Sequence, residues 1–128
     1  MANRNFDFMQ ALGKGVKLVS GSFAPNGAGA VSSASVKGKG FTVARTGVGV
    51  FTITLQDSYI ALLSCSADLQ LVAPDDKILQ FGAIDVVTAK TIVLNVYDIS
   101  GAALADIAAN AANRINFALI LSNTQVNS

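Results

Sequence analysis

The residues of this chain with the strongest potential for chemistry are its carboxylates. The 128-residue sequence contains eight acidic residues, all of them aspartate, and no histidine. Two aspartates that meet in space can act as acid and base in sugar hydrolysis, and clustered carboxylates can bind Ca²⁺. Without histidine, Ser-His-Asp triads and histidine metal ligands are excluded. The candidate aspartates are spread over separate segments: Asp57, Asp68, Asp75, Asp76, Asp85, Asp98 and Asp106.

The only adjacent acidic residues are Asp75 and Asp76, and their position after Pro74 is typical of a solvated turn. No Asp-x-Asp-x-Asp-Gly calcium loop is present. Charged residues make up 13% of the chain and hydrophobic residues 52%, which favours a packed domain over disorder. We therefore expect a structural or binding protein that is not an enzyme and that uses no metal and no cofactor.

The remaining chemical candidates have simpler explanations. Cys65 is the single cysteine, so it cannot form an intrachain disulfide, and its apolar surroundings predict a buried side chain. The sequence Gly47-Val-Gly49 runs into a strand pattern and lacks the context of a dinucleotide-binding loop. The glycines that flank Lys14 and Lys39 lack the spacing of a phosphate-binding loop. All three glycine pairs are therefore expected to form turns.

Charge is distributed unevenly along the chain. Residues 1–45 contain six basic residues and one acid, whereas residues 46–128 contain three basic residues and seven acids. A basic first third can meet an acidic surface, but it lacks the interleaved aromatic residues that stack on bases, so no nucleic-acid partner is expected. No stretch is long and apolar enough for a membrane span or a secretion signal, and we expect synthesis in a cytoplasm.

Two-residue alternation of apolar and polar side chains is the dominant structural signal. It predicts strands over 50–56, 91–98 and 115–122, and weaker strands over 16–19, 31–36, 41–45, 62–71 and 78–86. In the three stronger strands one face is consistently apolar, and most of these residues form the expected core: Phe51, Ile53, Leu55, Ile92, Leu94, Phe117, Leu119 and Leu121.

Clusters of Gly, Pro, Asn and Asp separate these segments and predict tight turns. Short strands at this spacing indicate an all-β, antiparallel β-sandwich, and we expect it to be jelly-roll-like. We divide this single domain into an extended N-terminal arm of low complexity, residues 1–40, and a sandwich, residues 41–128. The alanine-rich segment 102–113 is expected to be an ordered loop with one helical turn.

Some strands carry apolar side chains on both faces. Val93, Ala118 and Ile120 lie on the faces opposite the expected core. In a two-layer protein of this size the outer faces meet solvent, so apolar residues there indicate cover by another subunit.

Three segments resemble small virion proteins of tailed bacteriophages, most closely the capsid decoration (cement) type. They are the runs Thr46-Gly-Val-Gly-Val-Phe-Thr-Ile-Thr-Leu-Gln-Asp-Ser-Tyr, Val87-Thr-Ala-Lys-Thr-Ile-Val-Leu-Asn-Val-Tyr-Asp-Ile-Ser-Gly and Arg114-Ile-Asn-Phe-Ala-Leu-Ile-Leu-Ser-Asn. The resemblance covers residues 40–123. It implies a sandwich that forms a homotrimer, lies on the virion surface and clamps neighbouring major capsid proteins.

Extended N-terminal segments of such proteins commonly reach over capsid subunits, so the resemblance assigns capsid contact to the N-terminal third. The residues expected to make that contact are Arg4, Lys14, Lys17, Lys37 and Lys39. Two alternatives remain. One is a tail or fibre component that binds a receptor, although the nine aromatic residues fall mostly in strands. The other is a small carbohydrate- or ion-binding module, which requires two aspartates to converge in a cleft.

Overall fold

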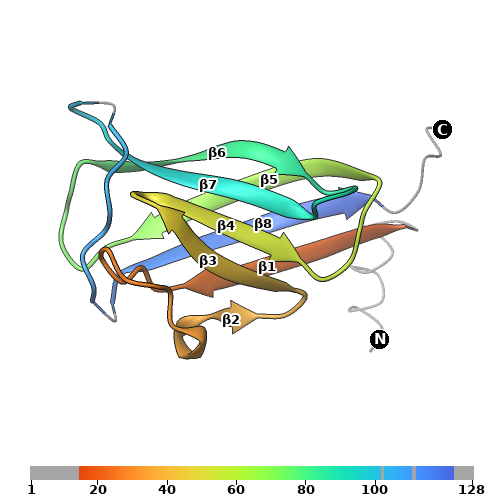
Figure 1. The fold of residues 1–128 in the computed structure, drawn as a ribbon, viewed down its shortest axis with the longest axis horizontal. Helices are drawn as coiled ribbons and strands as arrows, with labels where there is room; N and C mark the ends of the chain where they lie inside the picture. Colours follow the sequence, from red (N-terminus) through yellow and green to blue (C-terminus); the bar gives the residue numbers. More distant parts are fainter. Residues whose placement is uncertain (1–14, 102, 111, 123–128) are drawn as a thin grey trace, which may run out of the picture.

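In the computed structural model, residues 15–101, 103–110 and 112–122 are described. These residues form strands in two four-stranded sheets and one short 3-10 turn (Figure 1). Sheet A has the order β2-β1-β8-β5 and sheet B the order β3-β4-β7-β6. The elements are β1 (Val16–Phe23), η1 (Ser33–Ser35), β2 (Lys37–Gly38), β3 (Phe41–Gly47), β4 (Val50–Leu55), β5 (Ala61–Gln70), β6 (Lys77–Asp85), β7 (Thr91–Asp98) and β8 (Arg114–Ser122).

All strand pairs within these sheets are antiparallel. The β1–β2, β3–β4 and β6–β7 connections each stay within one sheet, and the other connections cross between the sheets. The predicted all-β, antiparallel, two-sheet architecture is therefore confirmed. The jelly-roll-like connectivity is not confirmed by this strand order and stays a prediction.

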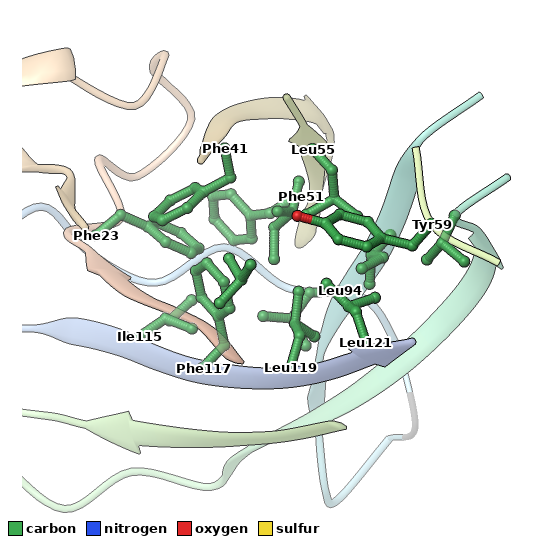
Figure 2. Packing of buried hydrophobic residues seen from close by; sticks show 14 of the residues in the cluster. Phe23, Phe41, Phe51, Leu55, Tyr59, Leu94, Ile115, Phe117, Leu119 and Leu121 are labelled. Carbon is green, nitrogen blue, oxygen red and sulfur yellow. The ribbon is translucent and has the colours of Figure 1, made fainter. Parts of the chain in front are cut away.

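The core lies between the two sheets, as the alternation predicts. The expected inward residues of β4, β7 and β8 are all 4% exposed or less. Phe23 of sheet A packs on Phe51 of sheet B with ring centroids 5.1 Å apart, and Phe41 meets Phe117 at 4.9 Å (Figure 2). Tyr59, between β4 and β5, closes one end of this cluster and is 5% exposed. The sandwich-like arrangement therefore rests on one continuous apolar cluster.

The first described strand corrects the predicted domain division. β1 lies between β2 and β8 in the middle of sheet A, and its residues Val19 and Phe23 belong to the core. The predicted boundary between an arm over 1–40 and a sandwich over 41–128 is therefore wrong for residues 16–38. Residues 1–14, the rest of the predicted arm, lie outside the described residues.

The predicted strand over 31–36 is also wrong, because η1 occupies its centre. The hydroxyl of Ser32 accepts the backbone N–H of Ala34, and the hydroxyl of Ser35 donates to the Ser32 carbonyl. Such local serine bonds satisfy the backbone without a neighbouring strand. The segment before β8 forms the expected ordered loop, although no helical turn lies within its described residues, 103–110 and 112–113. No helix in the described chain is long and apolar enough to cross a membrane.

Candidate binding surfaces

The side chains that point outward from sheet B form a surface with one charged group among the described residues, Asp85 at the end of the edge strand β6. Strand alternation and the register between β3, β4, β7 and β6 place these residues on one face, which we call the outer face of sheet B. Its members are Thr42, Ala44, Thr46, Val50, Thr52, Thr54, Ile78, Gln80, Gly82, Asp85, Thr91, Val93, Asn95 and Tyr97. The charged residues of these strands either alternate inward, as Arg45 does, or lie at strand ends.

One end of this face is apolar. Tyr97 is paired with Ile78 on one side and with Leu104, which adds a short bridge to β7, on the other. Ile78 is 49% exposed, Leu104 42% and the adjoining Ile99 62%. Ile78, Tyr97 and Ile99 also line an open depression of about 360 Å³. We call Ile78, Tyr97 and Leu104 the apolar row. The far end of the face consists of threonines with Asp85 beside them.

The outer face of sheet A has a different chemistry. It combines four serines with apolar residues such as Leu18 and Ile120, and it carries three charged residues, Lys37, Asp68 and Arg114. The guanidinium of Arg114 donates to the Ser22 hydroxyl at 2.7 Å and to the Ser35 carbonyl at 2.6 Å, so it is held against the protein. Ala118 and Ile120 lie on this face, whereas Val93 lies on sheet B. The three residues predicted to be covered by a subunit thus belong to two opposite surfaces.

The structure does not gather the predicted basic residues into one patch. Lys17, at the start of β1, has its ammonium 3.9 Å from the Asp57 carboxylate and 5.9 Å from the centre of the Tyr59 ring. Lys37 and Lys39 are exposed at the edge strand β2. Arg4 and Lys14 lie outside the described residues. Within the described chain, the positive charge at the β1–β2 side is therefore sparse and partly balanced by an acid.

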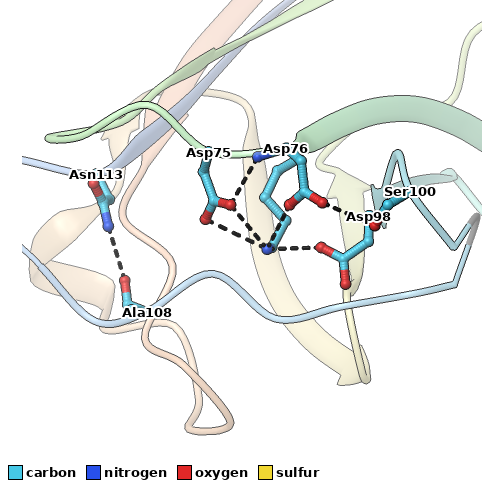
Figure 3. A network of polar contacts seen from close by, with 7 residues as sticks. Asp75, Asp76, Asp98, Ser100, Ala108 and Asn113 are labelled. Atoms are coloured by element: carbon cyan, nitrogen blue, oxygen red, sulfur yellow. Dashed lines mark hydrogen bonds and ion pairs between the residues drawn. The ribbon is translucent and has the colours of Figure 1, made fainter.

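The adjacent aspartates Asp75 and Asp76 form ion pairs with Lys77, which were not predicted from the sequence. The Lys77 ammonium lies 2.7 Å from Asp98, 3.4 Å from Asp75 and 3.6 Å from Asp76 (Figure 3). Its hydrogen bond with Asp98 raises the pKa of Lys77 to about 12. The lysine supplies the positive charge that a metal ion would bring. No group of three or more metal-ligating side chains converges anywhere in the described residues.

Asp106 and Asp85 likewise accept hydrogen bonds from within the fold. Asp106, in the loop before β8, accepts two hydrogen bonds from Arg45, at 3.0 and 2.8 Å, and one from the Gly49 N–H at 2.9 Å. The Arg45 hydrogen bond holds the pKa of Asp106 below its ordinary value. Asp85 accepts the N–H groups of the β6–β7 turn, and that lowers its pKa too. These contacts position the loops at the two ends of the sheets.

Replacing Asp106 by asparagine is expected to reduce the loss in the free energy of unfolding at low pH. A carboxylate whose pKa is lowered by folding stabilises the fold above its unfolded pKa, and this contribution is lost as pH falls through the folded pKa. Wild-type protein should therefore lose stability below about pH 4, near the ordinary aspartate pKa. Asp106→Asn should be less stable at pH 7 and lose less on acidification.

Denaturant unfolding at pH values from 7 to 2 measures this difference. Asp57→Asn is the matched control, because its carboxylate is 64% exposed and its ion pair with Lys17 is long. An Asp106→Asn profile parallel to that of the wild type would show that the Arg45 contact does not stabilise the fold.

Cys65 lies on the inner side of β5, half-buried, and packs against the core. The predicted turn at Gly47-Val-Gly49 is confirmed as the β3–β4 hairpin. The outer face of sheet B was not predicted from the sequence as a binding surface, although the alternating threonines of Thr42–Thr46 and Thr52–Thr54 indicate it.

Comparisons of the chain with protein-family models, with curated proteins and with solved structures give no match.

Proposed function

We propose that this chain is a structural virion protein that binds the outer surface of a capsid and stabilises the contacts between major capsid proteins. The proposal combines the sequence resemblance with the chemistry of the described surfaces. The single observation that carries it is the outer face of sheet B, which spans four strands and has its one charged residue, Asp85, at its edge. A sheet that faces only water has no need to exclude charge.

A face with little charge is suited to contact with another protein. Burial of charged groups requires their desolvation, which costs several kcal/mol per ion unless a partner compensates it. Threonine, asparagine and glutamine can exchange water for partner hydrogen bonds, and the apolar row gains from losing water. Contact with another protein is therefore favourable here, while the charged groups at the strand ends keep the rest of the molecule hydrated.

Repetition over the shell supplies the stabilisation. A homotrimer that contacts two neighbouring capsid subunits links them, and linkage raises the effective concentration of each second contact. Many copies of a weak joint together resist the outward pressure of a packaged genome. In this proposal the chain acts by geometry and burial and carries out no bond chemistry.

Capsid contact through the N-terminal segment is tested by deleting residues 2–14. The deletion ends before β1, so sheet A and its core residue Val19 are retained. It removes Arg4 and Lys14, and we expect capsid affinity to fall about tenfold, equivalent to about 1.4 kcal/mol. Sedimentation of capsids with increasing amounts of each protein measures the affinity. The double variant Lys37→Gln/Lys39→Gln tests the contribution of the two described lysines to capsid affinity separately from that of the deleted segment. Unchanged affinity in the deletion variant would show that the sheets alone make the contact.

Sedimentation with separated heads and tails of the same virion tests the proposal as a whole. Binding to heads that saturates at a fixed number of copies supports capsid decoration. Binding to tails alone would favour the tail or fibre role. Failure to bind either particle would refute the virion assignment.

A further inference from the structure

We propose that the outer face of sheet B binds a second copy of this chain. This inference rests on the oligomeric part of the proposed function and names the surface that part requires. Among the described residues this face combines three properties. It is continuous over four strands, its one charged residue is Asp85 at the edge, and it ends in the exposed apolar row.

Charge complementarity favours a second copy as the occupant. The described charged residues of this chain lie at strand ends and in loops, with the exceptions of Asp68 and Arg114 on sheet A and the inward-facing Arg45. Sheet stacking between copies therefore leaves the charged groups at the rim, where they keep their water. A contact between copies buries the centre of the face, where a charged group would lose its water without a counter-ion. The one charged residue of the outer face of sheet B, Asp85, lies at its edge.

The area also fits a contact between copies. Strand spacings of about 4.8 Å and a rise of about 3.3 Å per residue give this face a projection of roughly 400 Å². Side-chain relief raises the accessible area above the projection, and the adjoining Ile99 and Leu104 extend it. The projection is about half of the about 800 Å² per partner that stable interfaces bury, so the face can form the main part of such a contact.

The apolar row supplies the anchor for this contact. Tyr97 stands between Ile78 and Leu104 in cross-strand register, so the three side chains form one ridge. Tyrosine is one of the residue types that carry most of the binding energy in protein interfaces. Next to this ridge, Val50, Asn95 and Gln80 offer apolar and amide groups to the partner.

A lysine placed in the centre of the face tests the inference. Thr52 is on the central strand β4, half-buried and pointing outward. In Thr52→Lys the ammonium would be desolvated without a counter-ion, and the dissociation constant of the oligomer should rise at least about 100-fold. Thr52→Gln is the matched control, because it adds a long polar side chain without charge. Circular dichroism and thermal unfolding establish that both variants fold.

Light scattering after size exclusion reads out the result. Wild-type protein and Thr52→Gln should elute above the 13.1 kDa chain mass, with about 39 kDa for a trimer, and Thr52→Lys should elute as a monomer. Wild-type protein that is monomeric, or Thr52→Lys that keeps the wild-type mass, overturns the inference. A monomeric wild-type protein whose capsid binding is lost in Thr52→Lys would instead place the capsid protein on this face. The virion proposal would then stand without the contact between copies.

Discussion

Replacing Phe51 by alanine is expected to lower the free energy of unfolding by about 3–5 kcal/mol. Phe51 has no exposed surface and lies at the centre of the cluster, with its ring 5.1 Å from that of Phe23. It joins sheet B to sheet A, so its loss leaves a cavity between the two layers. Because domains of this size are stable by only about 5–15 kcal/mol, the change removes a large share of the total.

Urea unfolding followed by tyrosine fluorescence or circular dichroism measures the Phe51→Ala effect. Val48→Ala is the control, because Val48 lies at the tip of the neighbouring hairpin and is 54% exposed. The control should shift the free energy of unfolding by less than about 0.5 kcal/mol. A Phe51→Ala loss as small as that of the control would show that the two sheets do not share one core.

Replacing Gly49 by alanine should cost at least about 2 kcal/mol, because two effects act in the same direction. Its backbone has φ +65°, in the left-handed region that disfavours residues with a Cβ atom. An added Cβ would also lie 2.7 Å from the backbone nitrogen and oxygen of Ala105 and from the Val96 carbonyl oxygen. All three atoms belong to the backbone, which cannot move aside as a flexible side chain can.

Gly101→Ala is the matched control for this position. A Cβ there meets no atom within 4 Å, and Gly101 has no positive φ. Thermal unfolding should therefore show a clear decrease in the midpoint for Gly49→Ala and almost none for Gly101→Ala. Because Gly49 also donates its N–H to Asp106, the Gly49 variant should loosen the loop before β8, and hydrogen exchange at Ala105 measures that loosening. Equal midpoints for the two variants would contradict the close approach of hairpin and loop.

Alternation was sufficient to predict the central strands and their inward faces. β4, β7 and β8 fall within one residue of the predicted ranges, since each alternates without interruption between turn residues. β1 was predicted only to Val19, because Ser20-Gly21-Ser22 is also a typical turn sequence. In the structure Gly21 continues the strand. A Cβ at this position would lie 2.1 Å from the Phe41 ring, so the glycine makes room for an aromatic residue from the other sheet.

The partners of the polar residues could not be predicted, because they depend on the order of strands in the sheets. Arg45 and Asp106 are 61 positions apart and meet only where the β3–β4 hairpin touches the loop before β8. Asp98 meets Lys77 because β6 and β7 are neighbours in this register. The separation of Val93 from Ala118 and Ile120 has the same origin. Alternation shows that a residue has a second face but leaves open which sheet carries it.

The measurement that tests the central claim most directly is the temperature at which genome-free capsids lose their integrity, with and without the purified protein. Light scattering during heating follows the loss of intact shells. The proposal predicts that saturating amounts of protein raise this temperature and that the gain grows with the number of copies bound. An unchanged dissociation temperature on shells carrying a full complement of the protein would contradict a role in stabilising the capsid.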